Sequence, residues 1–318
     1  MLDKVERRKF LKATPAATAR FFVFVCFFLM LAGVAFAQNE GEKYVLDSLK
    51  MLLVVRTIES DILIETYVDG KEYAATGHYK EQTLPKATPE SFLRSMYRLE
   101  INFPMNVSTA GNSKPNRMTL ICHPSEDRGK NQITCYTCIE GDETFRTVDL
   151  AKVEARLKAA NNKPVFAQVS EIRSFGGLAG TMRQICQFYE FAAPIQENLH
   201  DEKTVATWKL TGTLRSQHHK DFLEKFGGLD KNEHNPTDFP SDIEIWLGRH
   251  NDFPYKIRYL RRTSEESSQK TLLFQKSFYK VNVDGTPIPE SKFAPLTPPE
   301  GVFSIQDDTE NFIKTLGL

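Results

Sequence analysis

The sequence predicts an α+β fold in which one large, curled antiparallel sheet carries helices on a single face. Roughly ten segments alternate apolar and polar residues with a period of two, as half-buried strands do. Their connections are short and follow no βαβ rhythm, which favours antiparallel pairing of consecutive strands. Helical spacing occurs only at the start, in the middle and near the end of the chain. Because so wide a sheet curls, the apolar alternation marks its inward side.

Residues 1–37 are predicted to be an export signal. A basic stretch ending at Arg20 precedes an apolar run, Phe21 to Ala37, which closes with the small residues of an A-x-A cleavage site after Ala37. The segment Arg7 to Lys12 resembles the twin-arginine export motif, so that route and the general secretory route both stay open. We expect an exported protein, periplasmic or otherwise extracytoplasmic. An uncleaved N-terminal membrane anchor is the alternative.

The composition of the remaining chain favours one globular domain, residues 38–318. Six of the 41 Lys and Arg and two of the 41 Asp and Glu lie in residues 1–37, so the remainder has a net charge of −4. This balance gives no electrostatic reason to bind nucleic acid or an anionic membrane surface. With 41% hydrophobic residues overall, a chain of this length can bury a substantial core.

The first half begins with a helix and continues with strands. Tyr44 to Val55 places apolar residues on one helical stripe. Ile62 to Val68 and Glu72 to Lys80 alternate on either side of Asp69-Gly70, the strongest short signal for a β-hairpin. Tyr97 to Phe103 forms the next strand. Further strands are expected at Met118–Cys122, Gln132–Ile139 and Glu143–Val148. One helix is expected to begin after Asp149, which caps it, and a second helix is expected after Gly176-Gly177.

The second half is predicted to be a meander of strands interrupted by a polar insert. Strands are expected at about Phe191–Gln196, Thr204–Leu214, Asp242–Leu247, Tyr255–Arg261 and Lys270–Val283. Residues 216–241 are polar and hold only a short helix. Asp308 is expected to cap a last helix, Thr309 to Leu316.

This order of elements resembles the LolA-like family of periplasmic lipoprotein carriers. The early hairpin returns through Gly77-His78-Tyr79, and the ending combines Phe293, Pro298-Pro299, Gly301-Val302 and Asp307-Asp308. The resemblance implies an unclosed half-barrel whose concave apolar face receives an acyl chain under helices that act as a lid. The carriers have a basic residue beside a proline after the second strand, whereas Tyr79 to Pro85 contains no Arg here. The chain is therefore a divergent, LolA-like member.

The alternating apolar residues are the candidates for a ligand-binding face. They are Tyr97, Leu99, Ile101, Phe103, Ile243, Ile245, Leu247, Tyr255, Ile257 and Tyr259 from the strands, with Met182 and Ile185 covering them from a helix. The same pattern fits a plain closed core, because period-two apolar residues belong to the core first. A ligand cavity differs from such a core only in being incompletely filled.

The cysteines are interpreted mainly as structural. Cys135 and Cys138 point to opposite faces if their segment is a strand, and no helix N-terminus is expected there to stabilise a thiolate. A zinc or redox site built with Cys122 and His123 is the alternative. Within the structural interpretation, a cross-strand disulfide between Cys122 and Cys135 is expected. Cys186 is predicted to be an ordinary buried thiol.

No motif argues for catalysis. His218, His219, His234 and Asp221 lie in the polar insert and are interpreted as parts of a solvated loop. Common hydrolase, metalloprotease and phosphate-loop patterns do not occur in the sequence.

We therefore expect a monomeric carrier of lipid or acylated protein, with no cofactor, that delivers to an envelope acceptor protein. The alternatives are an interaction or sensing module with a filled core, and a metal- or thiol-dependent enzyme that uses the cysteine–histidine group.

Overall fold

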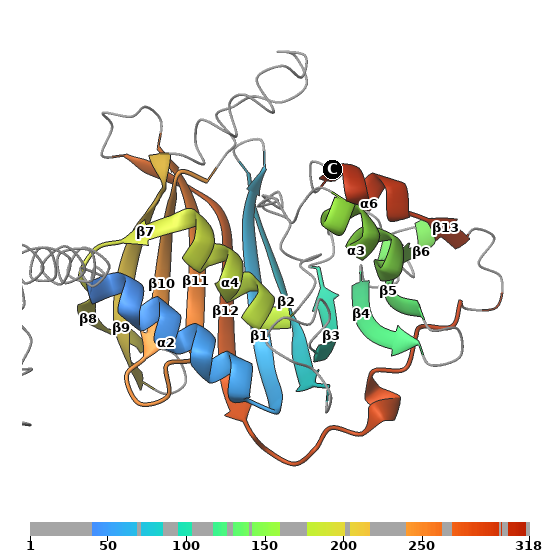
Figure 1. Cartoon of the computed structure of the whole chain (residues 1–318), viewed down its shortest axis with the longest axis horizontal. Coiled ribbons are helices and arrows are strands. Elements are labelled where there is room, and N and C mark those ends of the chain that lie inside the picture. Colours follow the sequence, from blue (N-terminus) through green and yellow to red (C-terminus); the bar gives the residue numbers. More distant parts are fainter. Residues whose placement is uncertain are drawn as a thin grey trace, which may run out of the picture. The chain divides into compact units, whose positions relative to one another are not determined.

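In the computed structural model, every strand of the described residues belongs to one sheet of 13 strands (Figure 1). Residues 40–318 form one compact unit. The structure describes residues 40–68, 71–84, 95–103, 117–125, 130–139, 142–159, 177–200, 204–216, 240–262, 269–298, 300 and 305–315. The predicted export signal and most of the polar insert, with its histidines, therefore lie outside the described residues.

Two antiparallel meanders make up most of the sheet. The first comprises β1 (Thr57–Val68), β2 (Lys71–Thr83), β3 (Ser95–Asn102), β4 (Arg117–Ser125), β5 (Lys130–Ile139) and β6 (Asp142–Asp149). The second comprises β8 (Ile195–His200), β9 (Thr204–Leu214), β10 (Asp242–Gly248), β11 (Pro254–Arg262) and β12 (Lys270–Val283). The short strand β7 (Tyr189–Phe191) does not pair with β8 and instead pairs with another part of β9. The first and last long strands, β1 and β12, pair with each other and join the two meanders.

The predicted large antiparallel sheet is confirmed, with one addition. The short strand β13 (Ile305–Asp307) pairs parallel to β6 and forms one end of the strand order, whose other end is β7. The order therefore describes an open sheet. The register of β1 and β2 pairs Val68 with Lys71, which agrees with the two-residue Asp69-Gly70 hairpin predicted from the sequence.

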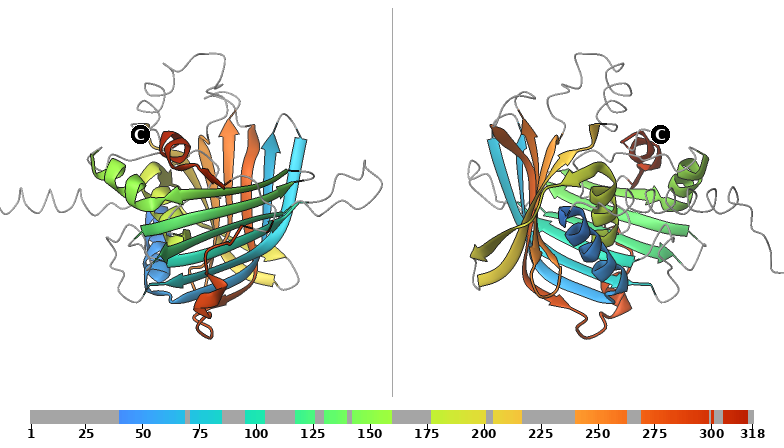
Figure 2. Two further views of the ribbon diagram at one scale, coloured as in Figure 1. Left: turned by 90° about the vertical axis from the view of Figure 1, so that its right-hand side faces the viewer. Right: turned by 60° about the vertical axis from the view of Figure 1, so that its left-hand side comes forward.

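Two helices cover one face of the second meander and of β1 (Figures 1 and 2). They are α2 (Glu40–Val54) and α4 (Gly177–Phe188), which pack against each other and each contact β7. The side of α2 toward the sheet carries Val45, Leu49 and Leu52, spaced three or four residues apart as one helical stripe requires. We call the sheet face under these helices the inner face and the opposite one the outer face.

Two further helices of the described residues extend the same core over the first meander. The helix α3 (Leu150–Ala159) packs on β5, and α6 (Thr309–Thr315) packs on β6 and α3. As predicted, Asp149 caps α3, because its carboxylate accepts the backbone N–H of Ala151 at 3.0 Å. Leu150 and Phe312 belong to the same apolar cluster as the core residues of α2 and α4. No helix in the described ranges is long and apolar enough to cross a membrane.

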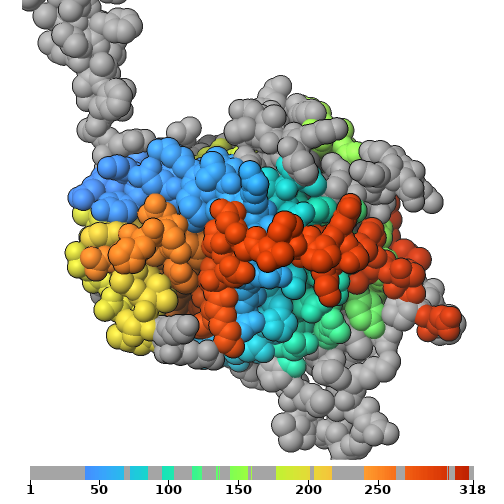
Figure 3. Space-filling model, turned by 90° about the horizontal axis from the view of Figure 1, so that it is seen from below, coloured from blue at the N-terminus to red at the C-terminus, as the bar shows by residue number. Residues whose placement is uncertain are grey.

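The proline-rich stretch after β12 is part of the fold. Figure 3 shows it as an orange-red band that crosses the surface over the cyan-to-green residues of the first meander. The Phe293 side chain is completely buried and packs with Ile288 and Met96, while the N–H of Ile288 donates to Gln82 at 3.0 Å. These contacts tie the segment that leads to β13 onto the sheet.

Removal of the Phe293 ring tests this attachment. Phe293→Ala is expected to lower the free energy of unfolding by about 3–5 kcal/mol, because it leaves a cavity where a phenyl ring was buried. Tyr73→Ala is the control, since Tyr73 is 50% exposed and its truncation should change stability by less than about 1 kcal/mol. Urea unfolding followed by fluorescence measures both. Equal effects of the two substitutions would show that the segment is not anchored at Phe293.

Candidate functional site

The predicted ligand-binding residues all belong to or pack against one apolar cluster. One of them, Tyr255, also lines a hollow on the opposite face of the sheet from the helices. Ten are buried: Tyr97, Leu99, Ile101, Met182, Ile185, Ile243, Ile245, Leu247, Ile257 and Tyr259. Phe103 and Tyr255 are half-buried and pack against the same cluster. Tyr255 lies at an irregularity in the β10–β11 register and contacts Phe253, with the ring centroids 5.2 Å apart. The sequence thus identified a continuous apolar surface, and the helices cover it.

Backbone pairing explains why these side chains share one face. Ile245 lies opposite Ile257 across the β10–β11 ladder, and Ile243 lies opposite Tyr259. Side chains directly opposite each other in an antiparallel ladder point to the same face. The aromatic rings of Tyr259 and Tyr189 extend this surface toward the end of α4, with centroids 6.4 Å apart.

A buried carboxylate interrupts the apolar inner face. Glu81 on β2 is 5% exposed and accepts three hydrogen bonds, from the Tyr79 hydroxyl at 2.6 Å, the Ser95 hydroxyl at 2.5 Å and the backbone N–H of Leu178 at 3.0 Å. The last donor belongs to the first turn of α4, where N–H groups lack helical partners and the helix dipole favours a negative charge. We call this arrangement the Glu81 clamp.

Gly177 allows the close approach that the Glu81 clamp requires. Its φ is +61°, and a Cβ atom at this position would lie 2.1 Å from an oxygen of the Glu81 carboxylate. A residue with a side chain would therefore meet both backbone strain and a steric clash. Burial, followed by the neighbouring Glu81 charge, raises the pKa of Tyr79 well above its ordinary value, which keeps the hydroxyl protonated as a donor.

The inner face also holds a lysine that the sequence analysis did not single out. Lys276 on β12 is 6% exposed and lies between Ile64 of β1 and Ile257 of β11. The signal for it was present in the sequence, because Phe274, Lys276 and Phe278 occupy alternate positions of one strand. An analysis of apolar periodicity does not detect such a residue, because it records only the apolar positions on either side.

Cys122 of the cysteine–histidine group does not have the environment of a reactive thiol. Cys122 carries a free and completely buried thiol, and burial, with a smaller contribution from Glu81, raises its pKa. Reactive cysteines instead have exposed, stabilised thiolates. The Nδ1 atom of His123 is buried without a hydrogen-bond partner among the described residues. No group of three or more metal-ligating side chains occurs in the described part of the chain.

The predicted disulfide between Cys122 and Cys135 is not formed in the structure, since Cys122 is a free thiol. The β4–β5 register gives the reason. Cys122 lies opposite Ile133, and Cys135 lies opposite Leu120, so the two cysteines are diagonal neighbours rather than a facing pair. Cys135 and Cys138 both lie within strand β5, as predicted. Cys186 on α4 is a half-buried free thiol whose pKa burial raises to about 11.

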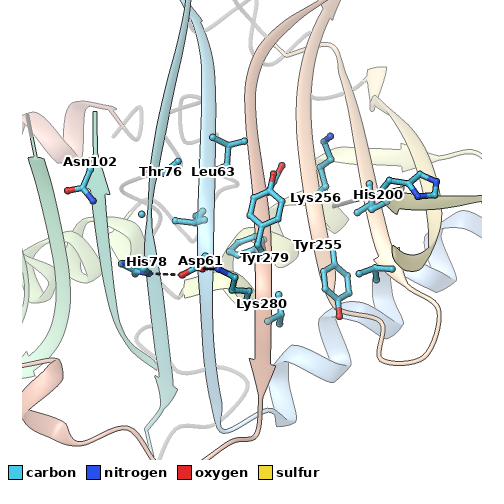
Figure 4. A pocket seen from close by; sticks show the side chains of 17 residues that line it. Asp61, Leu63, Thr76, His78, Asn102, His200, Tyr255, Lys256, Tyr279 and Lys280 are labelled. Carbon is cyan, nitrogen blue, oxygen red and sulfur yellow. Dashed lines mark hydrogen bonds and ion pairs between the residues drawn. The ribbon is translucent and has the colours of Figure 1, made fainter. Parts of the chain in front are cut away.

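The outer face carries a hollow of about 1100 Å³, lined by both polar and apolar residues, that sequence reasoning did not find (Figure 4). Near its centre, the Asp61 carboxylate lies 2.7 Å from His78 Nδ1 and 3.1 Å from Lys280 Nζ. Burial alone would raise the pKa of Asp61, but hydrogen bonds from Lys280 and His78 outweigh it and lower the pKa. Lys280 has a φ of +50° at a register shift between β1 and β12, typical of a β-bulge.

Comparison with known proteins gives a distant likeness in fold. No family model matches the chain, and no curated protein matches it. Three solved structures align with 80% of the chain: MucB at 12% identity and TM-score 0.37, a DUF1329 family protein from Desulfovibrio piger at 10% and 0.33, and a Vibrio parahaemolyticus domain assigned as an outer membrane lipoprotein-sorting protein at 8% and 0.31.

The matches cover different shares of those proteins. The alignment includes 95% of the D. piger and V. parahaemolyticus chains but 62% of MucB. A complex of MucA and MucB from Pseudomonas aeruginosa is also similar, at 11% identity and TM-score 0.35 over 60% of that chain.

Removal of the Glu81 carboxylate tests the clamp. Glu81→Ala is expected to lower the free energy of unfolding by about 3 kcal/mol or more, because three buried donors lose their acceptor. Hydrogen exchange should accelerate first in α4. Glu59→Ala is the matched control on β1, where the 40% exposed Glu59 pairs with Lys80 at the surface, and should cost less than about 1 kcal/mol. Unchanged exchange in α4 of the Glu81 variant would contradict the clamp.

The state of Cys122 can be tested by alkylation. Iodoacetamide at pH 8 should leave Cys122 unmodified in the native protein and modify it after denaturation, because the buried thiol is protonated. Cys186 should react slowly at pH 8 and faster as the pH approaches 11. Mass spectrometry of peptides separates the sites. Rapid native labelling of Cys122 would restore the thiol-enzyme alternative.

Proposed function

We propose that this protein is an exported binding protein that holds an acyl chain of a lipid or acylated protein against its inner face. The observation that carries this proposal is the continuous apolar surface of the inner face, which two separate helices cover. An acyl chain gains about 0.8 kcal/mol for each methylene that it buries, so such a surface is sufficient for tight binding.

Binding requires movement of the cover, because the helices already pack against the sheet. Met182 and Ile185 of α4 are buried in the apolar cluster. An acyl chain would take the place of these side chains while α2 and α4 move outward as a lid over a half-barrel. The Glu81 clamp holds the first turn of α4 in place, because the hydrogen bond from Leu178 is directional. The apolar contacts of the rest of the helix are not directional, so α4 can swing outward about its first turn.

The proposed setting follows from the sequence. The predicted export signal, residues 1–37, supports a location in the periplasm or another extracytoplasmic space, with an N-terminal membrane anchor as the alternative. We propose a monomer that binds without catalysis or a cofactor and delivers its ligand to an acceptor protein of the envelope.

The filled inner face also favours a second candidate, an envelope interaction or sensing module without a ligand. Ten of the twelve candidate residues are buried in the apolar cluster. In this alternative the helices do not move, and the protein acts through its outer surfaces. The two candidates differ in whether an acyl chain ever reaches the inner face.

Photocrosslinking separates these candidates. Native mass spectrometry of the protein from its own envelope should show a copurified lipid, and delipidated protein should incorporate a fatty acid that carries a diazirine on its chain. Labelled peptides should contain inner-face residues of β3, β10 and α4, including Tyr97 and Met182. Labelling confined to Tyr73, on the exposed part of β2, or no labelling at all would refute the binding proposal and favour the filled module.

A further inference from the structure

Lys276 is surrounded by apolar side chains. Ile64 and Ile257 flank it across the neighbouring strands, and Phe274 and Phe278 occupy the adjacent inward positions of its own strand. All four belong to the apolar cluster. Its ammonium therefore lies in the part of the sheet where the proposed acyl chain would bind.

Burial of a lysine at this position is costly. Transfer of an ammonium group from water to an apolar interior carries a large desolvation penalty unless an anion or polar groups compensate. An aliphatic residue would continue the alternation of β12 without that cost. Lys276 has interactions of its own within the protein, but an ammonium has three donors and can also bind an anion from a ligand.

Two hydroxyl groups add polarity to the same interior. Ser48 lies on the buried side of α2, between Val45 and Leu49, and Ser60 lies on β1 between the inward-facing Ile58 and Ile62. Within the described part of the chain, neither hydroxyl oxygen has a hydrogen-bond partner. Buried polar atoms normally have partners, so both are available to a polar ligand group or to water.

We propose that Lys276 binds the carboxylate of a fatty acid whose head group points into the protein. This inference rests on the proposed function and narrows its ligand to a single-chain anionic amphiphile. The carboxylate forms a charge-assisted hydrogen bond with the ammonium in a site from which water is excluded, and such bonds are stronger than neutral ones. The acyl chain then lies along the apolar surface formed by β10, β11 and β12.

The experiment compares two ligands of equal chain length, palmitate and 1-hexadecanol, on the delipidated full-length protein. Palmitate is expected to bind roughly 10- to 100-fold more tightly, as a hydrogen bond between charged groups would provide. Lys276→Met should reduce this preference to less than about threefold, and Lys276→Arg should restore most of it. Competition with the diazirine fatty acid measures both affinities.

Lys256→Met is the matched control for charge. Lys256 lies on the neighbouring strand β11 opposite Ser277, one position from Lys276 in the register. It belongs to the outer face, where it lines the outer hollow. Its loss changes the net charge equally and should preserve the palmitate preference. Thermal unfolding of each variant identifies any loss of folding, and the Lys276→Arg variant keeps the test valid if Lys276→Met does not fold.

The outcomes distinguish a failure of the proposed role of Lys276 from a failure of the proposed acyl-binding function. Equal binding of palmitate and hexadecanol to the wild-type protein would overturn the role of Lys276 and leave the acyl-binding function standing. The same conclusion would follow if Lys256→Met removed the preference as fully as Lys276→Met. If neither ligand binds, both the function and the inference fail.

Discussion

The carboxylate of Glu81 fixes where α4 begins. Its hydrogen bond to the Leu178 N–H joins the first turn of the helix to β2, and the bonds from Tyr79 and Ser95 hold the carboxylate itself in place. Apolar packing alone would leave the helix free to slide along the sheet, because hydrophobic contacts have no direction. The polar contact sets the helix position, and α2, which packs on α4, depends on it as well.

The two faces of the sheet differ in the charged residues that they carry. On the outer face, charges alternate along neighbouring strands and neutralise each other, as Glu244 does between Lys209 and Arg258. The indole of Trp246 lies beneath three cationic side chains there, and its N–H donates to Glu197 at 2.9 Å. Such pairs are partly solvated and add little stability individually. The inner face excludes charge apart from a few residues, so Glu81 and Lys276 each require a specific explanation.

Much of this architecture could be predicted from local patterns. Period-two alternation located the long strands, and the position of Asp149 identified the start of α3, because both signals depend on residues close in sequence. The apolar residues of the inner face were found for the same reason. That helices cover these apolar residues was inferred only from the order of the elements.

The parts that escaped prediction depend on contacts between distant residues. Glu81 receives its partner from a helix that begins 96 residues later, and the parallel pairing of β13 with β6 joins segments about 160 residues apart. The diagonal offset of Cys122 and Cys135 depends on strand register, which local sequence does not determine. The outer hollow likewise combines β1, β2, β11 and β12, so no single segment carries its signal.

The pairing of β1 with β12 has a consequence for how the chain folds. These strands pair Ile58 with Val283, so the centre of the sheet closes a loop of more than 200 residues. The two meanders can each form from neighbouring segments, but one edge of each remains unpaired until β12 meets β1. Contacts this distant in sequence slow folding, because the entropy of loop closure is lost before the pairing compensates for it. The centre of the sheet therefore stays incomplete until β12 has been synthesised.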